Sequence, residues 1–271
     1  MAELLVRSGI PDSEGKVLEI TPQSAGWEYV GFEVFVLSKG DILRRSTDHR
    51  EACLVLLTGK ANVNTANAYF PDIGRRMNVF EGIPPYSVYV PAGDRFEAEA
   101  LTDMELVCCW SPAEGTLEAR LIPPEDVAVT KRGHGTMERT IRNILPEEGL
   151  AERLLVVEVA TPAGHWSSYP PHKHDRLDLP NESYLEETYY HRINPGHGFA
   201  VQRVYTDDRS IDEALIVRDG DAVLVPKGYH PVSAPPGYEV YYLNVMAGPV
   251  RTWKFHNDPE HEWLFEQGGR T

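Results

Sequence analysis

The chain is divided into many short strand-like segments, and this pattern constrains its fold more than any other feature. Glycine (22) and proline (21) are spread through all 271 residues, so they interrupt the sequence at short intervals. The segments between them are rich in Val, Tyr, Phe and Leu, which favour strands. We expect strands at 30–36, 52–57, 86–90, 105–110, 154–159, 187–192, 200–205, 213–217, 222–225 and 239–246. Many short strands at this spacing predict an all-β sandwich or barrel.

Helical patterns are rare in this sequence. Residues 138–144 are one of the few stretches that suggest a helical turn or two. On that interpretation, Arg139 and Arg142 need only form a solvated helix face.

The composition argues against several kinds of partner. A formal net charge of -15 disfavours nucleic acids and anionic membranes, which call for a basic patch. No apolar stretch approaches the roughly 18 residues that cross a bilayer, and no signal-peptide pattern opens the chain. The three cysteines, with Cys108 and Cys109 adjacent in an apolar run, indicate reduced core thiols. We therefore expect a cytoplasmic protein that binds neither nucleic acid nor membrane.

Two short motifs in the second half look like the halves of one metal site. In His172-Lys173-His174 both imidazoles share a face, because side chains alternate along a strand. In Pro226-Lys-Gly228-Tyr-His230 a tight turn delivers a third histidine. Three histidines and a carboxylate would form a site for a divalent transition metal.

Glu186 and Glu187 compete for the place of the carboxylate. Glu187 is preferred, because it opens a strand in which Tyr189 and His191 share its face. This ligand set suits Zn, Mn, Fe, Co or Ni and does not choose among them. Four protein ligands leave an open position only at a metal with more than four ligands, which favours a substrate-binding site over a closed structural one.

A weak internal repeat predicts two barrels. In the first half, a run from Glu51 is followed by an apolar run that ends in Pro91-Ala-Gly93. In the second half, Glu187 and its strand are followed by a run that ends in Pro226-Lys-Gly228. The first copy offers only Phe96 and an isolated upstream histidine where the second offers ligands. We expect a degenerate N-terminal barrel without metal ligands at 1–115, a connector at 116–150 and a metal-binding barrel at 151–271.

These motifs resemble those of the cupin superfamily, whose first motif carries His-x-His and Glu and whose second carries Gly, Pro-x-Gly and His. The corresponding residues here are His172, His174, Glu187, Gly220, Pro226, Gly228 and His230. The spacing departs from the superfamily pattern in two places: the gap from His174 to Glu187 is wider, and the turn before His230 is one residue shorter.

Both departures, with the surrounding sequence, resemble one narrower family. The runs 169–175, 186–191, 198–205, 225–231 and 242–248 are similar to those of the 5-deoxy-glucuronate isomerases, relatives of the 4-deoxy-5-keto-uronate isomerases. The resemblance implies a bicupin, with two double-stranded β-helix (jelly-roll) barrels and one divalent metal in the second. It also implies metal-assisted aldose-ketose isomerisation of a deoxyuronic acid, 5-deoxy-glucuronate to 5-dehydro-2-deoxy-gluconate, in myo-inositol degradation.

Several side chains near the motifs are candidates for contact with such a substrate. Asp175 and Arg176 follow the histidine pair, and Arg176 could clamp a uronate carboxylate, although a surface ion pair fits it equally well. His191 and Tyr189 could transfer protons, although a tyrosine that fills the barrel is the plainer interpretation of Tyr189.

A further pair, Gln202 and Arg203, alternates along a strand, so one of the two faces inward.

Two other functions share the same residues. A cupin-type dioxygenase also uses three histidines and a glutamate, but it would consume oxygen. A non-catalytic sugar-binding bicupin would need the metal only for its structure. The sequence leaves the oligomeric state open, including a homo-oligomer.

Overall fold

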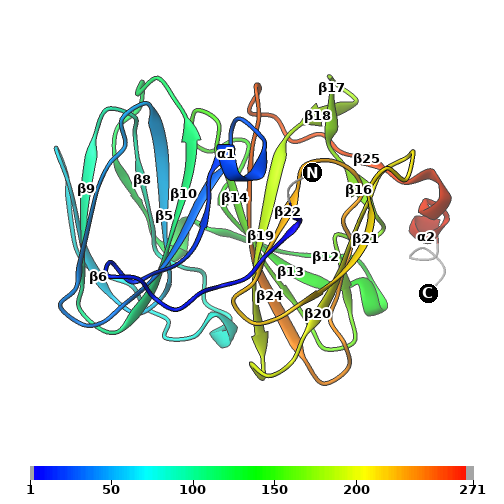
Figure 1. Ribbon diagram of the computed structural model, residues 1–271, viewed down its shortest axis with the longest axis horizontal. Coiled ribbons are helices and arrows are strands. Elements are labelled where there is room, and N and C mark those ends of the chain that lie inside the picture. The colour runs from blue at the N-terminus through cyan, green and yellow to red at the C-terminus, as the bar shows by residue number, and fades with distance from the viewer. Residues whose placement is uncertain (1–2, 267–271) are drawn as a thin grey trace. The chain divides into compact units, whose positions relative to one another are not determined.

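The computed structural model describes residues 3–266, and strands dominate it (Figure 1). The chain forms two compact units. The N-terminal unit comprises Ser8–Ala128 and Asn143–Val156, and the C-terminal unit comprises Val129–Arg142 and the described parts of Met1–Arg7 and Val157–Thr271. The boundaries expected from the sequence (1–115, 116–150 and 151–271) stay a prediction, and residues 116–150 contribute to both units.

The N-terminal unit contains a six-stranded and a four-stranded sheet. The larger sheet has the order β11 (Arg120–Ile122), β8 (Ser87–Val90), β5 (Arg50–Thr58), β10 (Met104–Pro112), β3 (Gly31–Leu37), β2 (Lys16–Ile20). The smaller sheet has the order β4 (Ile42–Ser46), β9 (Arg95–Ala100), β6 (Ala61–Thr65), β7 (Tyr69–Ile73).

The C-terminal unit repeats this arrangement. Its larger sheet has the order β1 (Leu5–Val6), β22 (Ala222–Val225), β19 (Glu186–Asn194), β24 (Glu239–Ala247), β14 (Leu155–Thr161), β13 (Arg139–Leu145), β12 (Ala128–Arg132). Its smaller sheet has the order β15 (Trp166–Ser167), β23 (Val232–Ser233), β20 (Ala200–Tyr205), β21 (Asp212–Val217). Two short pairs join β16 (His172–Lys173) to β25 (His256–Asn257) and β17 (Asp175–Asp178) to β18 (Glu182–Tyr184).

Helices are few and short. They are α1 (Pro22–Ala25), α2 (Trp263–Glu266) and the 3-10 turns η1 (Val79–Glu81), η2 (Pro124–Asp126), η3 (Gly135–Met137) and η4 (Pro259–His261). Within residues 3–266, none of these helices has the length and apolar character that crossing a membrane requires.

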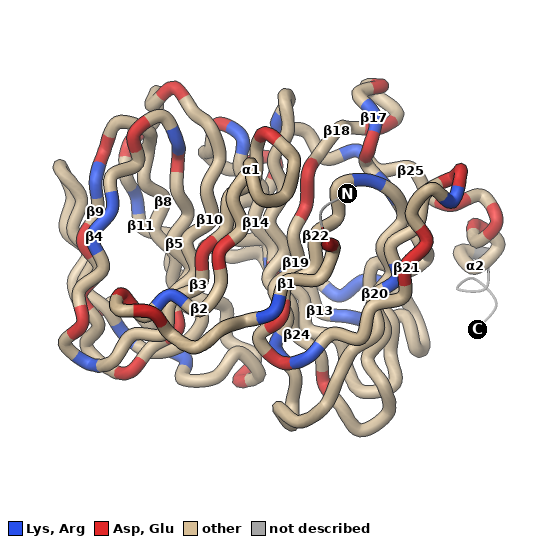
Figure 2. Tube along the Cα trace, viewed as in Figure 1, with Lys and Arg blue, Asp and Glu red and all other residues tan. Residues whose placement is uncertain are grey.

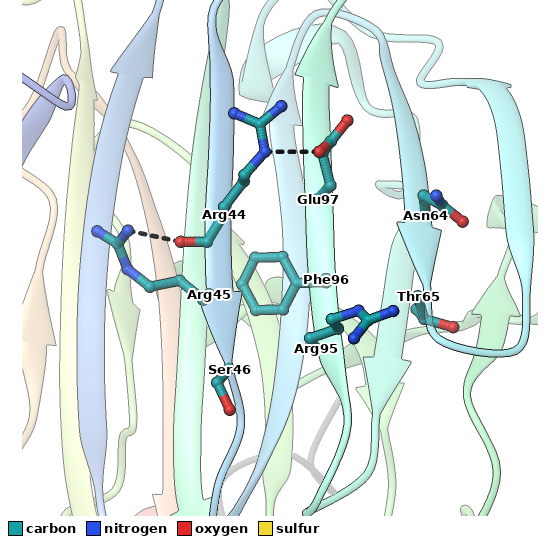
Figure 3. Close-up of a pocket in the computed structure, with 8 residues that line it drawn as sticks. All are labelled: Arg44, Arg45, Ser46, Asn64, Thr65, Arg95, Phe96 and Glu97. Carbon is teal, nitrogen blue, oxygen red and sulfur yellow. Dashed lines mark hydrogen bonds and ion pairs between the residues drawn. The ribbon is translucent and has the colours of Figure 1, made fainter.

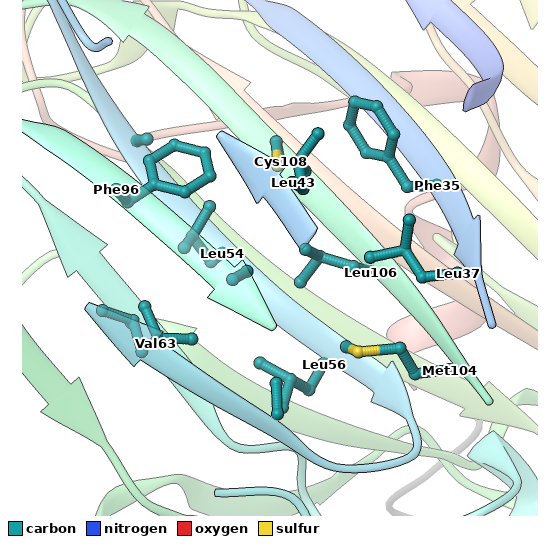
Figure 4. Close-up of a cluster of buried hydrophobic side chains, with 14 of the residues drawn as sticks. Phe35, Leu37, Leu43, Leu54, Leu56, Val63, Phe96, Met104, Leu106 and Cys108 are labelled. Atoms are coloured by element: carbon teal, nitrogen blue, oxygen red, sulfur yellow. The ribbon is translucent and has the colours of Figure 1, made fainter. Parts of the chain in front are cut away.

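Each unit buries an apolar core between its two sheets. Strand β9 lies between β4 and β6 in the smaller sheet. Along it, Phe96 and Ala98 are buried and Arg95 is exposed, because successive side chains of a strand point to opposite faces. In the N-terminal unit these inward residues meet Leu54 and Leu106 of the larger sheet (Figure 4). The core therefore fills the position near Phe96 where the sequence repeat placed a ligand.

Of the three buried cysteines, Cys108 belongs to this core. Cys53, Cys108 and Cys109 are buried and free of disulfides. Burial raises the pKa of Cys53 to about 12 and the pKa of the other two thiols well above the usual range. Charged residues are spread along both units (Figure 2), and a few of them, Glu51 and Glu158 among them, are buried.

The prediction of an all-β chain is confirmed, and each segment predicted as a strand overlaps a strand. The prediction of a helical turn at 138–144 is wrong, because this segment is β13. Arg142 is not solvated either: it is buried, with its Nη1 3.1 Å from Oε1 of Glu158. Ile141 and Leu145 are four residues apart, a spacing that puts them on one face of either a helix or a strand, and pairing with neighbouring strands decides the outcome.

The register of the two larger sheets shows how the units differ. Val90, just before the first Pro-x-Gly turn, pairs with Ala52, whereas Val225, just before the second, pairs with Glu187. The N-terminal unit therefore has Ala52 in the place of Glu187. Glu51 lies one residue earlier, and its carboxylate accepts bonds from the Tyr89 hydroxyl and three backbone N–H groups at 152–154.

Candidate metal centre

Three segments of the C-terminal unit bring the metal-binding candidates together. His172 opens β16, and His174 follows that strand directly. Glu187 lies in β19 opposite Val225 of the neighbouring strand β22. Because the Pro-x-Gly turn begins immediately after Val225, the chain delivers His230 beside Glu187.

The three histidines converge on one point. One ring nitrogen of each of His172, His174 and His230 lies within 4.8 Å of those of the others. Nε2 of His174 and Nε2 of His230 lie 3.0 and 3.1 Å from Oε2 of Glu187. The candidate ligands predicted from the sequence thus lie together.

The hydrogen bonds of the imidazoles fix which nitrogen faces this point. Nδ1 of His174 lies 3.1 Å from the Leu185 carbonyl, and Nδ1 of His230 lies 2.8 Å from the Gly228 carbonyl. A carbonyl only accepts, so each Nδ1 carries the proton and each Nε2 offers a lone pair.

Those lone pairs have no hydrogen-bond partner. Nε2 of His174, Nε2 of His230 and Oε2 of Glu187 are buried without one, despite their short contacts. Each buried polar atom left in this way costs about 1–3 kcal/mol. A cation coordinated by all three would remove that cost, so these residues fit a divalent metal.

The charge states suit such a cation. Burial lowers the pKa of His172 and His230, which keeps both imidazoles neutral. Burial alone would raise the pKa of Glu187, but His230 and His174 outweigh it and lower that pKa to about 2. Burial opposes protonation of His174 as well, but Glu187 raises its pKa. His172, His230 and Glu187 are therefore in the forms that bind metals, and a metal that binds His174 would displace any proton that Glu187 stabilises on its Nε2.

The turn before His230 is held by glycine and by Asp175. Gly228 has φ +91°, and a Cβ there would lie 2.4 Å from the Tyr205 carbonyl oxygen. Its N–H donates to Oδ2 of Asp175 at 2.9 Å. The other oxygen of Asp175 accepts from the buried Nζ of Lys173 at 2.8 Å. Asp175 therefore ties the His-x-His strand to the Pro-x-Gly turn.

Two adjoining cavities reach this cluster. The smaller, of about 40 Å³, is lined by Glu187, Tyr189, Tyr242 and Asn244 among others. The larger, of about 410 Å³, has aromatic walls that include Tyr169, Trp253, Phe255 and Phe265. Both are lined by Arg132, Arg139, His172 and Trp253. The larger volume is in the usual range for a small-molecule site.

Of the two residues suggested for proton transfer, one lines a cavity. Tyr189 lines the smaller cavity, with its hydroxyl 3.1 Å from Oγ of Ser168. His191 is completely buried, and its Nε2 lies 2.9 Å from Oε1 of Gln202. Neither His191 nor Gln202 is among the described residues that line the two cavities.

The charged residues suggested for substrate binding lie elsewhere. Arg176 is 66% exposed and pairs with Asp207 at 3.1 Å. Arg203 makes two bonds to Asp212, of 2.8 and 3.0 Å. Among the described linings of the two cavities, Asp175, Arg176 and Arg203 are absent. Their roles in substrate binding stay a prediction.

The sequence interpretation missed the arginines that do line the cavities. Arg132 ends β12 and Arg139 begins β13, the segment that was expected to be helical. A strand at 139–145 would have placed Arg139 and Ile141 on one face, and both line the smaller cavity. The signal was present in the period-two alternation.

Comparison with known proteins decides the family. The model of the KduI/IolB family matches residues 4–264. The chain belongs to the KduI/IolB family. A member of it, the 5-deoxy-glucuronate isomerase of Geobacillus kaustophilus, is 66% identical over 98% of this chain and 96% of its own length.

Solved structures agree with this family assignment. An IolB-like protein from Salmonella typhimurium LT2 superposes with a TM-score of 0.95 at 52% identity, covering 97% of this KduI/IolB chain and 100% of its own. Lactobacillus farciminis oxalate decarboxylase, in a formate complex, has a TM-score of 0.68 at 13% identity, covering 98% and 91%. The latter likeness concerns the fold alone, and it supports the bicupin architecture.

Proposed function

We propose that this chain is a metal-dependent isomerase that interconverts 5-deoxy-glucuronate and 5-dehydro-2-deoxy-gluconate. The reaction moves a hydrogen from C2 to C1 of the open-chain aldehyde acid and a proton from the C2 hydroxyl oxygen to the C1 oxygen, which leaves a ketone at C2 and an alcohol at C1. One observation carries the proposal: buried, unpartnered ligand atoms converge beside a cavity, in a chain 66% identical to a 5-deoxy-glucuronate isomerase. A place in myo-inositol degradation follows from the same likeness.

His172, His174, Glu187 and His230 would hold the metal. A bound divalent cation supplies Lewis-acid polarisation of the substrate oxygens, which stabilises the charge that develops when the C2 proton leaves. The donor set is compatible with Zn, Mn, Fe, Co or Ni. Asn244 donates to Oε1 of Glu187 and so orients the carboxylate.

Tyr189 is the side chain we assign to proton transfer at a substrate oxygen. Burial, reinforced by the charge of Glu187, raises its pKa well above the ordinary value. The phenol therefore stays protonated in the resting site, with its proton available to a substrate oxygen in the smaller cavity. Burial lowers the pKa of His191 to about 4, so its imidazole is neutral. Gln202 holds this ring, which stacks beside the Tyr189 ring with the centroids 6.1 Å apart.

The proposal is tested by turnover of 5-deoxy-glucuronate under nitrogen, followed by NMR. The aldehyde signal should decay in the absence of oxygen, and chelation of the metal should stop the decay. Adding back a divalent metal should restore it.

The same assay separates the competing functions. A dioxygenase would leave the sugar unchanged under nitrogen and consume oxygen in air. A non-catalytic sugar-binding protein would leave it unchanged in both. Either result with metal fully loaded would contradict the isomerase.

A further inference from the structure

Two arginines flank the cavities from neighbouring strands. Arg132 closes β12 and Arg139 opens β13, and the two strands are adjacent in the larger sheet of the C-terminal unit. Both arginines line the larger and the smaller cavity, as His172 does. Two positively charged side chains therefore line the same cavities as the metal-ligand candidate His172.

These arginines lack acidic partners. Within residues 3–266, no carboxylate forms an ion pair with Arg132 or Arg139. Several other arginines of the unit are paired: Arg142 with Glu158, Arg192 with Asp219, and Arg203 with Asp212. Exposed arginines such as Arg209 and Arg218 also have no carboxylate partner in the described residues, but Arg132 and Arg139 differ from them because both line the cavities.

Arg139 is also held in position with donors to spare. Its Nη1 donates to the carbonyls of Met137 and Tyr169, both at 3.1 Å. Nε and Nη2 make no hydrogen bond to the described residues, so one edge of the guanidinium is available for a planar acceptor.

The shared linings place this charge close to the metal candidates, because Arg139 and His172 line both cavities and Glu187 lines the smaller one. Burial lowers the pKa of Arg139, and the nearby positive charge of Arg132 adds to that effect. An anion between the two guanidinium groups would relieve their repulsion.

We propose that Arg132 and Arg139 bind the carboxylate of the sugar acid, with its carbonyl end directed toward His172, His174, Glu187 and His230. This inference rests on the proposed function, because a deoxyuronate carries its carboxylate at the end of the chain opposite the aldehyde. Recognition at both ends makes the site selective for an acid over the matching neutral sugar. Aromatic side chains such as Trp253 and Phe255 then cover the carbon chain between the two ends.

Binding to chelated protein tests the clamp without turnover. Calorimetry compares 5-deoxy-glucuronate with its neutral analogue 5-deoxyglucose, in the wild type and in Arg139→Gln and Arg132→Gln. The wild type should prefer the acid, and each substitution should reduce that preference roughly 10- to 100-fold, as expected for a charged hydrogen bond. Arg132→Gln is the safer variant, because Arg139 also holds the Met137 and Tyr169 carbonyls.

A matched control comes from another arginine-lined hollow. In the N-terminal unit, the hollow over β4, β6 and β9 is lined by Arg44, Arg45 and Arg95 (Figure 3). Arg44 forms an ion pair with Glu97 at 2.7 Å, and Arg45 forms one with Glu14 at 2.8 Å. This hollow therefore does not contain two neighbouring arginines without acidic partners. Arg95→Gln removes one positive charge and should leave the preference for the acid unchanged.

The outcomes separate this inference from the proposed function. The clamp is supported if acid binding weakens in the chelated cavity variants while the same variants before chelation hold as much metal as the wild type, even should the wild type fail to isomerise the sugar. It is overturned if the wild type shows no binding of the acid or no preference for it, or if the cavity variants keep the full preference.

Discussion

At the scale of single residues, the candidate site depends on atoms that have no partner inside the protein. The Nδ1 atoms of His174 and His230 are committed to backbone carbonyls, which turns both Nε2 atoms toward Glu187. A purely structural histidine cluster would satisfy these atoms by hydrogen bonds. Their convergence is the residue-level reason to place a metal here.

Tyr189 gives the prediction at this scale. Tyr189→Phe removes a hydroxyl that lies 3.1 Å from Ser168 and should lower kcat roughly 10²- to 10⁴-fold, while metal content stays unchanged. Because burial raises the pKa of Tyr189, its deprotonation should not limit kcat as the pH rises toward 10. Steady-state kinetics across pH, with metal analysis, measures both.

A second buried tyrosine serves as the control for that experiment. The hydroxyl of Tyr205 donates to Asp258 at 2.7 Å, and this side chain is absent from the described linings of both cavities. Tyr205→Phe should lose stability but keep kcat. Equal losses of kcat in the two variants would refute the role of Tyr189.

Residue identity could be predicted from sequence where chemistry and spacing coincide. His-x-His in a strand, together with a histidine after Pro-x-Gly, predicted that His172, His174 and His230 lie together, and their ring nitrogens do lie within 4.8 Å of one another. Arg176 shows the limit of that approach. Adjacency to the histidine pair says nothing about where a long side chain extends, and Asp207 holds it in an exposed ion pair.

At the scale of elements, the Pro-x-Gly turn after β22 is the part that must be built most exactly. The backbone of Gly228 has a positive φ, its N–H donates a hydrogen bond to the Asp175 carboxylate, and its carbonyl accepts one from Nδ1 of His230. Gly228→Ala adds the strain of a positive φ to a close contact with the Tyr205 carbonyl oxygen. We expect a loss of about 2–4 kcal/mol in the free energy of unfolding, with weaker metal binding.

The corresponding turn of the N-terminal unit provides the control. Gly93 also has a positive φ, of +77°, but a Cβ there would meet no atom within 4 Å. Gly93→Ala should therefore cost only the strain, about 1–2 kcal/mol, and leave metal binding intact. Denaturant unfolding and metal titration of the two variants test the account, which fails if Gly228→Ala behaves like Gly93→Ala.

Strand register explains what the sequence pattern could and could not resolve between elements. The repeat of an apolar strand followed by Pro-x-Gly located β8 and β22 correctly. It did not reveal that Ala52, rather than Glu51, corresponds to Glu187, because a shift of one residue is visible only when the partner strand is known. The same lack of partner strands led to a helical interpretation of β13.

At the scale of the whole molecule, one strand order serves two purposes. The order β8-β5-β10-β3 in the N-terminal unit corresponds to β22-β19-β24-β14 in the C-terminal unit. The former packs on an apolar core alone, whereas the latter packs on its own apolar core and also contributes Glu187 to the site beside the histidine cluster. The all-β class followed from the sequence because alternating, turn-bounded segments have few other solutions. The assignment of activity needed the family as well, since the fold supports several chemistries.

The central claim is that isomerisation depends on one metal held by the His172, His174, Glu187 and His230 cluster. Titration of a divalent metal into chelated protein under nitrogen, with turnover of 5-deoxy-glucuronate read by NMR, tests it most directly. Turnover should rise in proportion to bound metal and saturate at about one ion per chain, as expected for one four-ligand site, and His174→Ala should recover little. Full turnover by the metal-free protein, or unchanged metal-dependent turnover in His174→Ala, would contradict the claim.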